Sequence, residues 1–183
     1  MNNKIGIGIA GLGTVGEGFL KQLKKYKTSN KKTSNFELIN IAVKNLRKKR
    51  NVATRNLPLI KDTLSLASNP KIDIVIELIG GSSGVSYKLV KKSLMNGKSI
   101  ITANKALLAI HGNELIKIAE KNNCFISFEA AIAGGIPVVK AIRENLKFNE
   151  ITKVYGILNG TCNYILTKME TEGKDFNSVL KDA

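Results

Sequence analysis

The stretch Gly8-Ile-Ala-Gly-Leu-Gly-Thr-Val-Gly-Glu-Gly18 joins a strand-like segment to a helix-like segment near the start of the chain. Before it, isoleucines alternate with small residues, which is typical of a β-strand. After Val15, apolar residues recur at helical spacing. A Gly11-x-Gly13-x-x-Gly16 turn between a strand and a helix is the fingerprint of a dinucleotide-binding site.

Each glycine of this turn has its own expected role. Gly11 allows a tight turn, Gly13 lets the backbone approach a pyrophosphate, and Gly16 lets the helix pack closely on the strand. The helix N-terminus favours the negative charge of the phosphates. An ordinary glycine-rich loop is the alternative, and the flanking strand and helix disfavour it. We therefore expect the turn to bind the cofactor through Gly11, Leu12, Gly13, Thr14, Val15 and Gly16.

The rest of the chain continues to alternate strands and helices. The apolar run 72–78 is typical of a buried parallel strand, and Gly97 ends the helix before the next strand. Further strands are expected at 37–43, 100–101 and 124–129, and helices at 15–26, after Asp62, at 85–96 and at 112–122. This order predicts an α/β fold with a Rossmann-type doubly wound parallel sheet.

A small-residue linker, residues 130–137, separates two predicted domains. Residues 1–130 form the NAD(P)-binding Rossmann domain. Residues 131–183 form the incomplete start of an α+β substrate and dimerisation domain. Its expected elements are a helix at 138–146, a strand at 151–158, a helix opening near Thr161 and a last helix capped by Asp175.

Composition restricts the class of protein. The 183 residues carry a formal charge of +15, which raises nucleic-acid binding as a rival function. No nucleic-acid-binding motif accompanies the basic residues, so we expect no nucleic-acid partner. We see no secretory signal and no apolar run long enough for a membrane span. Cys124 and Cys162 in an α/β pattern are typical of reduced thiols, and we expect a cytoplasmic protein without a membrane partner.

The end of the second strand indicates which cofactor is preferred. NAD-binding folds usually place a carboxylate there to bind the ribose hydroxyls, and residues 43–45 contain none. Lys44 and Arg47 follow instead, and both suit a 2′-phosphate. A solvated basic loop is the alternative interpretation. We predict NADP(H) as the preferred cofactor, with NAD(H) still possible.

Five segments, in order along nearly the whole chain, resemble homoserine dehydrogenase. The first is common to many Rossmann proteins, whereas the last three are together specific to this family. The segments are Ala10-Gly-Leu-Gly-Thr-Val-Gly16, Val75-Ile-Glu-Leu-Ile-Gly-Gly81, Thr102-Ala-Asn-Lys-Ala-Leu-Leu-Ala109, Phe128-Glu-Ala-Ala-Ile-Ala-Gly-Gly-Ile-Pro137 and Gly156-Ile-Leu-Asn-Gly-Thr-Cys-Asn-Tyr164.

The resemblance implies NAD(P)H-linked interconversion of L-aspartate 4-semialdehyde and L-homoserine, in threonine and methionine biosynthesis. Lys105 is the expected catalytic residue of this chain, because it follows a strand at the carboxyl edge of the sheet. The family's main proton-donor lysine and its acidic residues are expected downstream of residue 183. We therefore expect this chain alone to be inactive. The cofactor is expected to contact Ile79, Gly80, Thr102, Ala103 and Lys105 as well.

Other residues are assigned by the resemblance. Gly160 and Thr161 are expected to bind the substrate carboxylate near a helix N-terminus. A monovalent-cation site, for sodium, is expected from a carboxylate and backbone carbonyls, and the full-length family implies a homodimer. The cation ligands are Glu129, Ile132, Gly134 and Ile136.

Two residues of reactive types, a cysteine and a histidine, are interpreted as structural. Cys162 has no base beside it in sequence, and hydride transfer to an aldehyde needs no thiol. His111, expected in a loop between helices, has no second metal ligand at usable spacing, so a catalytic zinc is not expected. The alternative functions are a stand-alone NADP-binding module and another NADP oxidoreductase of a small aldehyde.

Overall fold

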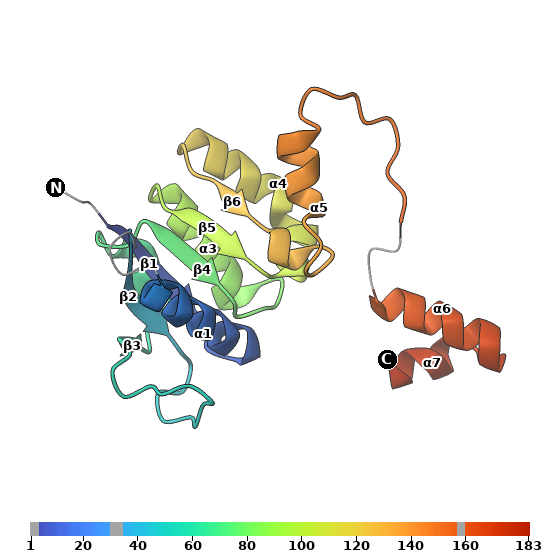
Figure 1. Cartoon of the computed structure of the whole chain (residues 1–183), viewed down its shortest axis with the longest axis horizontal. Coiled ribbons are helices and arrows are strands. Elements are labelled where there is room, and N and C mark those ends of the chain that lie inside the picture. Colours follow the sequence, from blue (N-terminus) through green and yellow to red (C-terminus); the bar gives the residue numbers. More distant parts are fainter. Residues whose placement is uncertain (1–3, 30–34, 157–159) are drawn as a thin grey trace. The chain divides into compact units, whose positions relative to one another are not determined.

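The computed structural model describes residues 4–29, 35–156 and 160–183. The chain divides into two compact units, residues 1–131 (unit 1) and residues 132–183 (unit 2). Unit 1 contains a six-stranded sheet with the order β3-β2-β1-β4-β5-β6 (Figure 1). Every neighbouring pair of strands is parallel. This is the doubly wound Rossmann order, and it confirms the predicted fold class.

The strands of unit 1 are short and lie close to their predicted positions. They are β1 (Ile5–Ala10), β2 (Phe36–Ala42), β3 (Leu59–Ile60), β4 (Ile74–Glu77), β5 (Ser99–Thr102) and β6 (Ile126–Ser127). The sequence analysis missed β3, because a two-residue strand leaves no alternation to detect. The helical elements are α1 (Thr14–Ser29), α2 (Ser65–Ser68), α3 (Gly84–Met95), α4 (Lys105–Lys121) and the 3-10 helix η1 (Glu129–Ala131).

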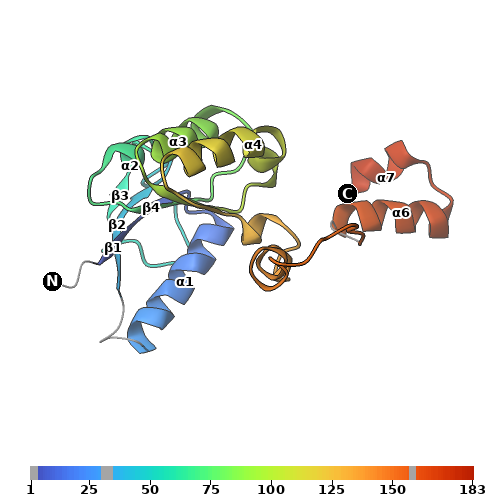
Figure 2. The ribbon, with the colours of Figure 1, turned by 90° about the horizontal axis from the view of Figure 1, so that it is seen from above.

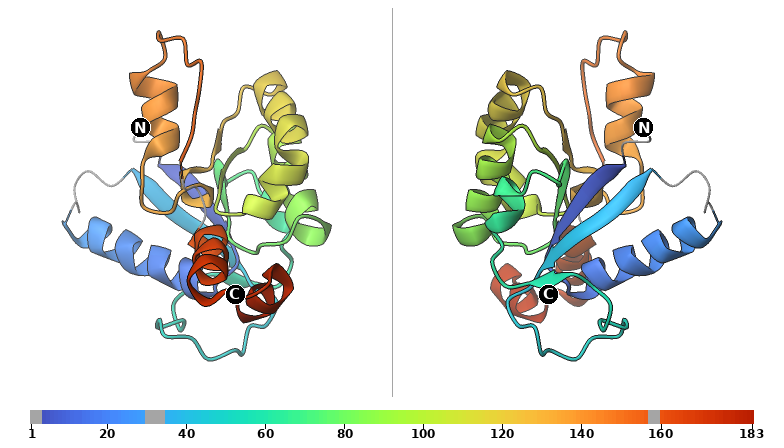
Figure 3. Two further views of the ribbon diagram at one scale, coloured as in Figure 1. Left: turned by 90° about the vertical axis from the view of Figure 1, so that its right-hand side faces the viewer. Right: turned by 90° about the vertical axis from the view of Figure 1, so that its left-hand side faces the viewer.

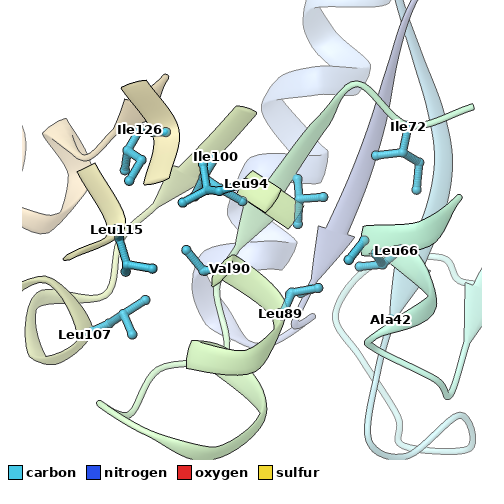
Figure 4. Packing of buried hydrophobic residues seen from close by; sticks show 14 residues of the cluster. Ala42, Leu66, Ile72, Leu89, Val90, Leu94, Ile100, Leu107, Leu115 and Ile126 are labelled. Atoms are coloured by element: carbon cyan, nitrogen blue, oxygen red, sulfur yellow. The ribbon is translucent and has the colours of Figure 1, made fainter. Parts of the chain in front are cut away.

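The helices cover the two faces of the sheet unequally. Helix α1 lies on one face, and α2, α3 and α4 lie on the other (Figures 2 and 3). Side chains alternate along β1, so Ile7 and Ile9 pack with Leu20 of α1, whereas Ala10 packs on the opposite side. The larger core lies beneath the three helices (Figure 4). Its members include Ala42, Leu66, Ile72, Leu89, Val90, Leu94, Ile100, Leu107, Leu115 and Ile126.

Helix α4 begins earlier than predicted. The expected helix at 112–122 starts at Lys105, because Asn104 is an effective N-cap. The Oδ1 atom of Asn104 accepts a hydrogen bond from the Leu107 amide at 3.1 Å. The prediction that His111 lies in a connecting loop was therefore wrong. His111 lies within α4, and its ring centroid is 4.2 Å from that of Tyr87 on α3.

Unit 2 is helical where the structure describes it. Its elements are α5 (Val138–Lys140), the π-helix η2 (Ala141–Asn145), α6 (Gly160–Glu172) and α7 (Phe176–Asp182). The predicted cap of the last helix is confirmed, because Asp175 accepts hydrogen bonds from the amides of Asn177 and Ser178. The predicted strand at 151–158 was wrong for residues 151–156, which have no partner strand among the described residues of unit 2, while 157–158 lie outside the described residues.

Among the described helices, none is long and apolar enough to cross a bilayer.

One buried hydroxyl offers a test of the core beneath α3. Ser93 is fully buried, and among the described residues its Oγ is the buried side-chain polar atom without a hydrogen-bond partner. We predict that Ser93→Ala raises the free energy of unfolding by about 1 kcal/mol, because it removes an unsatisfied polar group and adds a better helix former. Urea unfolding followed by circular dichroism measures the change.

Ser86 is the matched control for this prediction. It is equally buried on the same helix, but its Oγ accepts a hydrogen bond from Asn104 Nδ2 at 3.1 Å. Ser86→Ala is expected to lower the free energy of unfolding by about 1 kcal/mol, because it leaves an amide donor unpaired. Equal destabilisation by both variants would contradict the idea that the Ser93 hydroxyl is unsatisfied.

Candidate functional site

A pocket lies at the carboxyl edge of the sheet, where the strand order reverses. Strand β1 pairs with β2 on one side and β4 on the other, and doubly wound sheets bind ligands outside the strand ends at this point. The pocket has a volume of about 1040 Å³. Segments following four strands and the start of α3 line it: Gly11, Leu12, Gly13, Ala42, Val43, Lys44, Asn45, Leu46, Arg47, Lys48, Arg50, Lys61, Thr63, Leu78, Ile79 and Val85.

The three glycines of the opening turn differ in their surroundings. Gly11 has a φ of +99°, and a Cβ there would lie 2.6 Å from the Leu78 carbonyl oxygen. A Cβ on Gly16 would lie 2.6 Å from the Gly11 carbonyl oxygen. Both positions therefore need glycine to build the turn itself. Around Gly13, by contrast, a Cβ would meet nothing within 4 Å, although Gly13 lines the pocket. The open space beside Gly13 fits a backbone that approaches a ligand.

Basic side chains surround the part of the pocket that follows β2 and β3. Lys44, Arg47, Lys48 and Lys61 are exposed lining residues. None of the pocket's described lining residues is acidic. Sequence reasoning missed Lys61, because only the pairing of β3 with β2 brings it beside the loop after β2.

Arg50 has a different role from the other basic residues. Its guanidinium donates hydrogen bonds to the carbonyl oxygens of Asn45 at 2.7 Å, Lys48 at 3.0 Å and Leu12 at 3.4 Å. These contacts tie the basic loop to the glycine-rich turn. The side chain of Arg50 is thus occupied in holding the loop.

The pocket brings together only part of the predicted cofactor set. Six predicted residues line it: Gly11, Leu12, Gly13, Lys44, Arg47 and Ile79. The other predicted residues lie outside its lining: Thr14, Val15, Gly16, Gly80, Thr102, Ala103 and Lys105. Thr14 opens α1, and Thr102 ends β5. The pocket thus includes the start of the glycine-rich turn, the basic residues after β2 and Ile79 after β4, but none of the predicted residues at the end of β5 or the start of α4.

A buried carboxylate organises the neighbouring strand ends. Glu77, the last residue of β4, is fully buried. Its Oε1 accepts hydrogen bonds from the amides of Ile79 at 2.9 Å and Gly80 at 3.1 Å, and its Oε2 accepts one from the Thr102 hydroxyl at 2.6 Å. Sequence reasoning quoted Glu77 in a motif but gave it no role. An acidic residue inside an apolar run was the available signal.

The same polar network continues to the start of α4. The Asn104 amide donates to Thr102 Oγ1 at 3.0 Å, and Asn104 Nδ2 donates to the Gly81 carbonyl oxygen at 2.7 Å. Lys105 is the next residue, exposed in the first turn of α4. The backbone that carries Lys105 is therefore joined by hydrogen bonds to the loop after β4.

The predicted cation and substrate residues fall in both units. Glu129 lies in η1 of unit 1, whereas Ile132, Gly134 and Ile136 lie in unit 2. Gly160 and Thr161 form the first turn of α6, and the neighbouring residues 157–159 of that motif lie outside the described residues. In the part of the chain that the structure describes, no group of three or more His, Cys, Asp or Glu residues is arranged to hold a metal ion.

His111 belongs to a polar cluster between α3 and α4, away from the pocket. Lys91 Nζ donates to Glu114 Oε1 at 2.7 Å and to the Tyr87 hydroxyl at 3.0 Å. Hydrogen bonds from Lys91 and Tyr87 hold the pKa of the Glu114 carboxyl below its usual value. His111 Nδ1 lies 3.7 Å from Glu114 Oε2. These contacts join two neighbouring helices, and we therefore interpret His111 as a structural residue of the interface between α3 and α4.

Known proteins match both units of the chain. A family model described as the NAD-binding domain of homoserine dehydrogenase matches residues 11–129. A second model, described as homoserine dehydrogenase, matches residues 137–183. The chain belongs to the homoserine dehydrogenase family. Homoserine dehydrogenases are oxidoreductases, and their NAD-binding domain corresponds to the part of this chain that holds the glycine-rich turn and the pocket.

Individual homoserine dehydrogenases agree with this assignment. The enzyme of Pseudomonas aeruginosa is 44% identical over 179 residues, which cover 97% of this chain and 41% of that protein. The enzyme of Bacillus subtilis is 40% identical over 181 residues, covering 98% of this chain and 42% of its own length. The chain thus spans about two fifths of the length of these homoserine dehydrogenases.

Solved homoserine dehydrogenase structures share the fold. The structure from Thiobacillus denitrificans matches with a TM-score of 0.83 at 42% identity, over 98% of this chain and 42% of that chain. A hyperthermophilic archaeal homoserine dehydrogenase in complex with NADPH matches with a TM-score of 0.77 at 25% identity. That match covers 98% of this chain and 60% of the archaeal chain.

Proposed function

We propose that this chain is the cofactor-binding part of a homoserine dehydrogenase and that it binds NADP(H) in the pocket at the carboxyl edge of the sheet. The observation that carries the proposal is the open space at Gly13, on a turn whose other two glycines are required by the backbone. A pyrophosphate bound there would approach the N-terminus of α1, where free amides and the helix dipole favour negative charge.

The preference for NADP(H) over NAD(H) rests on the charge of the pocket. Lys44, Arg47, Lys48 and Lys61 line it, without an acidic lining residue. A 2′-phosphate adds negative charge and oxygen acceptors that cations bind well, whereas a free ribose 2′-hydroxyl is usually bound by a carboxylate. Arg47 and Lys44 are the proposed phosphate ligands. Arg50 positions their loop through its backbone hydrogen bonds.

The reaction we propose for the full-length protein is the interconversion of L-aspartate 4-semialdehyde and L-homoserine, a step of threonine and methionine biosynthesis. NADP(H) supplies or accepts the hydride when bound. In this chain, Lys105 would polarise the substrate carbonyl from the first turn of α4, and the remaining acid–base groups would come from downstream sequence. Ile79, Gly80, Thr102 and Ala103, at the ends of β4 and β5, would support the nicotinamide half.

The other proposed roles concern the second unit and the assembly. Gly160 and Thr161 would bind the substrate carboxylate at the start of α6. Glu129, with the carbonyls of Ile132, Gly134 and Ile136, would bind sodium, since hard cations prefer oxygen ligands. We propose a homodimer for the full-length protein. The cytoplasm is the proposed compartment, because Cys124 and Cys162 are both free thiols.

Titration of NADPH and NADH into the purified chain, followed by nicotinamide fluorescence at two salt concentrations, tests the cofactor proposal. We expect saturable binding, with NADPH about tenfold tighter, because one charge-assisted hydrogen bond contributes at least that factor. Salt should weaken NADPH more than NADH. No binding by folded protein would refute a cofactor site in this chain.

The double variant Lys44→Ala/Arg47→Ala tests the source of the preference. We expect it to remove most of the advantage of NADPH, about tenfold in Kd, and to change the Kd for NADH by less than about twofold. Lys117→Ala, which changes an exposed lysine on α4 outside the pocket lining, is the charge-matched control. An unchanged ratio of the two Kd values in the double variant would contradict the phosphate role.

Homoserine oxidation by the same purified chain separates cofactor binding from catalysis. We expect NADPH to bind and homoserine to remain unoxidised when NADP⁺ is supplied as the hydride acceptor, because catalysis needs several groups held together in one geometry. Measurable turnover would show that the residues present in this chain suffice for the reaction.

A further inference from the structure

We infer that Glu77 is a positioning residue of the cofactor site, which holds the Ile79–Gly80 loop and the start of α4 in their binding arrangement. The inference rests on the proposed cofactor function and deepens it. Glu77 itself is fully buried and does not line the pocket, so it acts through other residues.

The first step of the argument is the placement of the carboxylate. Glu77 and Thr102 are register partners at the ends of the parallel strands β4 and β5. Register partners project to the same face of a sheet, so the Thr102 hydroxyl can donate to Glu77 Oε2, at 2.6 Å. A buried carboxylate is costly unless its oxygens accept hydrogen bonds. Among the described residues, the three hydrogen bonds that Glu77 accepts come from neutral donors at or just after the two strand ends.

The second step concerns the loop after β4. The amides of Ile79 and Gly80 both point to Glu77 Oε1. In a trans peptide the N–H and the C=O point in opposite directions. The carbonyls of Leu78 and Ile79 therefore point away from the buried carboxylate, and these two residues line the pocket. Glu77 thus fixes the orientation of the two peptide planes that follow β4, at an edge of the pocket that Leu78 and Ile79 line.

The third step is the connection to Lys105. Thr102 Oγ1 donates to Glu77 and accepts from the Asn104 amide, and Asn104 caps α4 and holds the Gly81 carbonyl through Nδ2. One continuous network therefore links the loop after β4 with the first turn of α4. Loss of the carboxylate would release both segments together, because a buried network holds its geometry only while each member is satisfied.

Glu77→Ala and Glu77→Gln test the inference with two readouts, the Kd for NADPH and the amide hydrogen exchange of Ile79 and Gly80 measured by NMR without cofactor. We expect Glu77→Ala to speed exchange at both amides by about tenfold and to weaken NADPH binding by a similar factor. Glutamine keeps an acceptor for the two amides and a donor for Thr102, so it should stay within about threefold of the original chain in both readouts.

Two further variants keep the test decisive. Thr102→Val removes only the hydroxyl while preserving side-chain shape, and it replaces Glu77→Ala in the test if that variant fails to fold. We expect Thr102→Val to change the exchange rates and the Kd for NADPH by about threefold. Ser93→Ala, another buried polar substitution but outside the network, should leave both readouts unchanged.

The outcomes separate this inference from the cofactor proposal. Unchanged exchange at Ile79 and Gly80 in Glu77→Ala would overturn the positioning role, as would equal damage from glutamine and alanine. If the original chain fails to bind NADPH, the cofactor proposal fails alone, and amide exchange still decides whether Glu77 holds the loop.

Discussion

Gly13→Val is expected to weaken NADPH binding by about thirtyfold, with little change in the fold. Gly13 lines the pocket, and a Cβ at this position would meet no protein atom within 4 Å. Its φ is not positive, so an L side chain is allowed. The added methyl groups would occupy space that a pyrophosphate needs beside the backbone, and loss of one or two charge-assisted hydrogen bonds corresponds to a factor of about this size.

Gly13→Ala should give a smaller loss, because it adds only a Cβ. The matched control is Gly18→Ala, on the exposed side of α1, where a Cβ also meets nothing within 4 Å. That variant should keep the Kd for NADPH and raise the free energy of unfolding by about 0.5–1 kcal/mol, since alanine is the better helix residue. Full NADPH affinity in Gly13→Val would refute the placement of the phosphates at this turn.

Gly6→Ala is expected to cause the largest loss of stability, about 3 kcal/mol, by overpacking against backbone. A Cβ on Gly6 would lie 1.8 Å from the Lys71 carbonyl oxygen. The backbone cannot move aside easily, because the Gly6 amide donates to Asp73 Oδ2 at 2.6 Å and the Gly6 carbonyl accepts from the Asp73 amide at 2.9 Å. Thermal unfolding should show a Tm lower by about 10 °C.

Gly97→Ala provides a graded comparison for this prediction. Gly97 has a φ of +72° but open space around its Cβ position, so backbone strain alone should cost about 1 kcal/mol. From most to least stable, the order should therefore be Gly18→Ala, the original chain, Gly97→Ala and Gly6→Ala. A Gly6→Ala variant as stable as Gly97→Ala would show that β1 and the segment before β4 can separate without cost.

Helix boundaries and short strands were the least predictable parts of the fold. The expected helix at 112–122 starts at Lys105, because the cap depends on how the Asn104 side chain is held by Gly81 and Ser86. Those partners are distant in sequence. Strand β3 exists through its pairing with β2, and residues 151–156 lack such a partner among the described residues of unit 2. Strand formation requires a neighbour, which local pattern does not supply.

The sequence by itself determined the order of the longer strands and helices of unit 1, the parallel sheet and the glycine-rich turn. These follow from local periodicity, from glycine's freedom at positive φ and from the burial of apolar runs. It also predicted that Lys44 and Arg47 belong to the candidate site, and both line the pocket because they follow directly from the end of β2.

Only the tertiary structure decided which polar groups meet. Arg50 donates a hydrogen bond to the glycine-rich turn and so connects the basic loop to it. Lys61 lines the pocket. Glu77 accepts hydrogen bonds from donors at the ends of two strands. Each of these contacts joins residues that lie on different strands or loops. Their partners are set by the register of the sheet and by helix packing, which depend on the whole core at once.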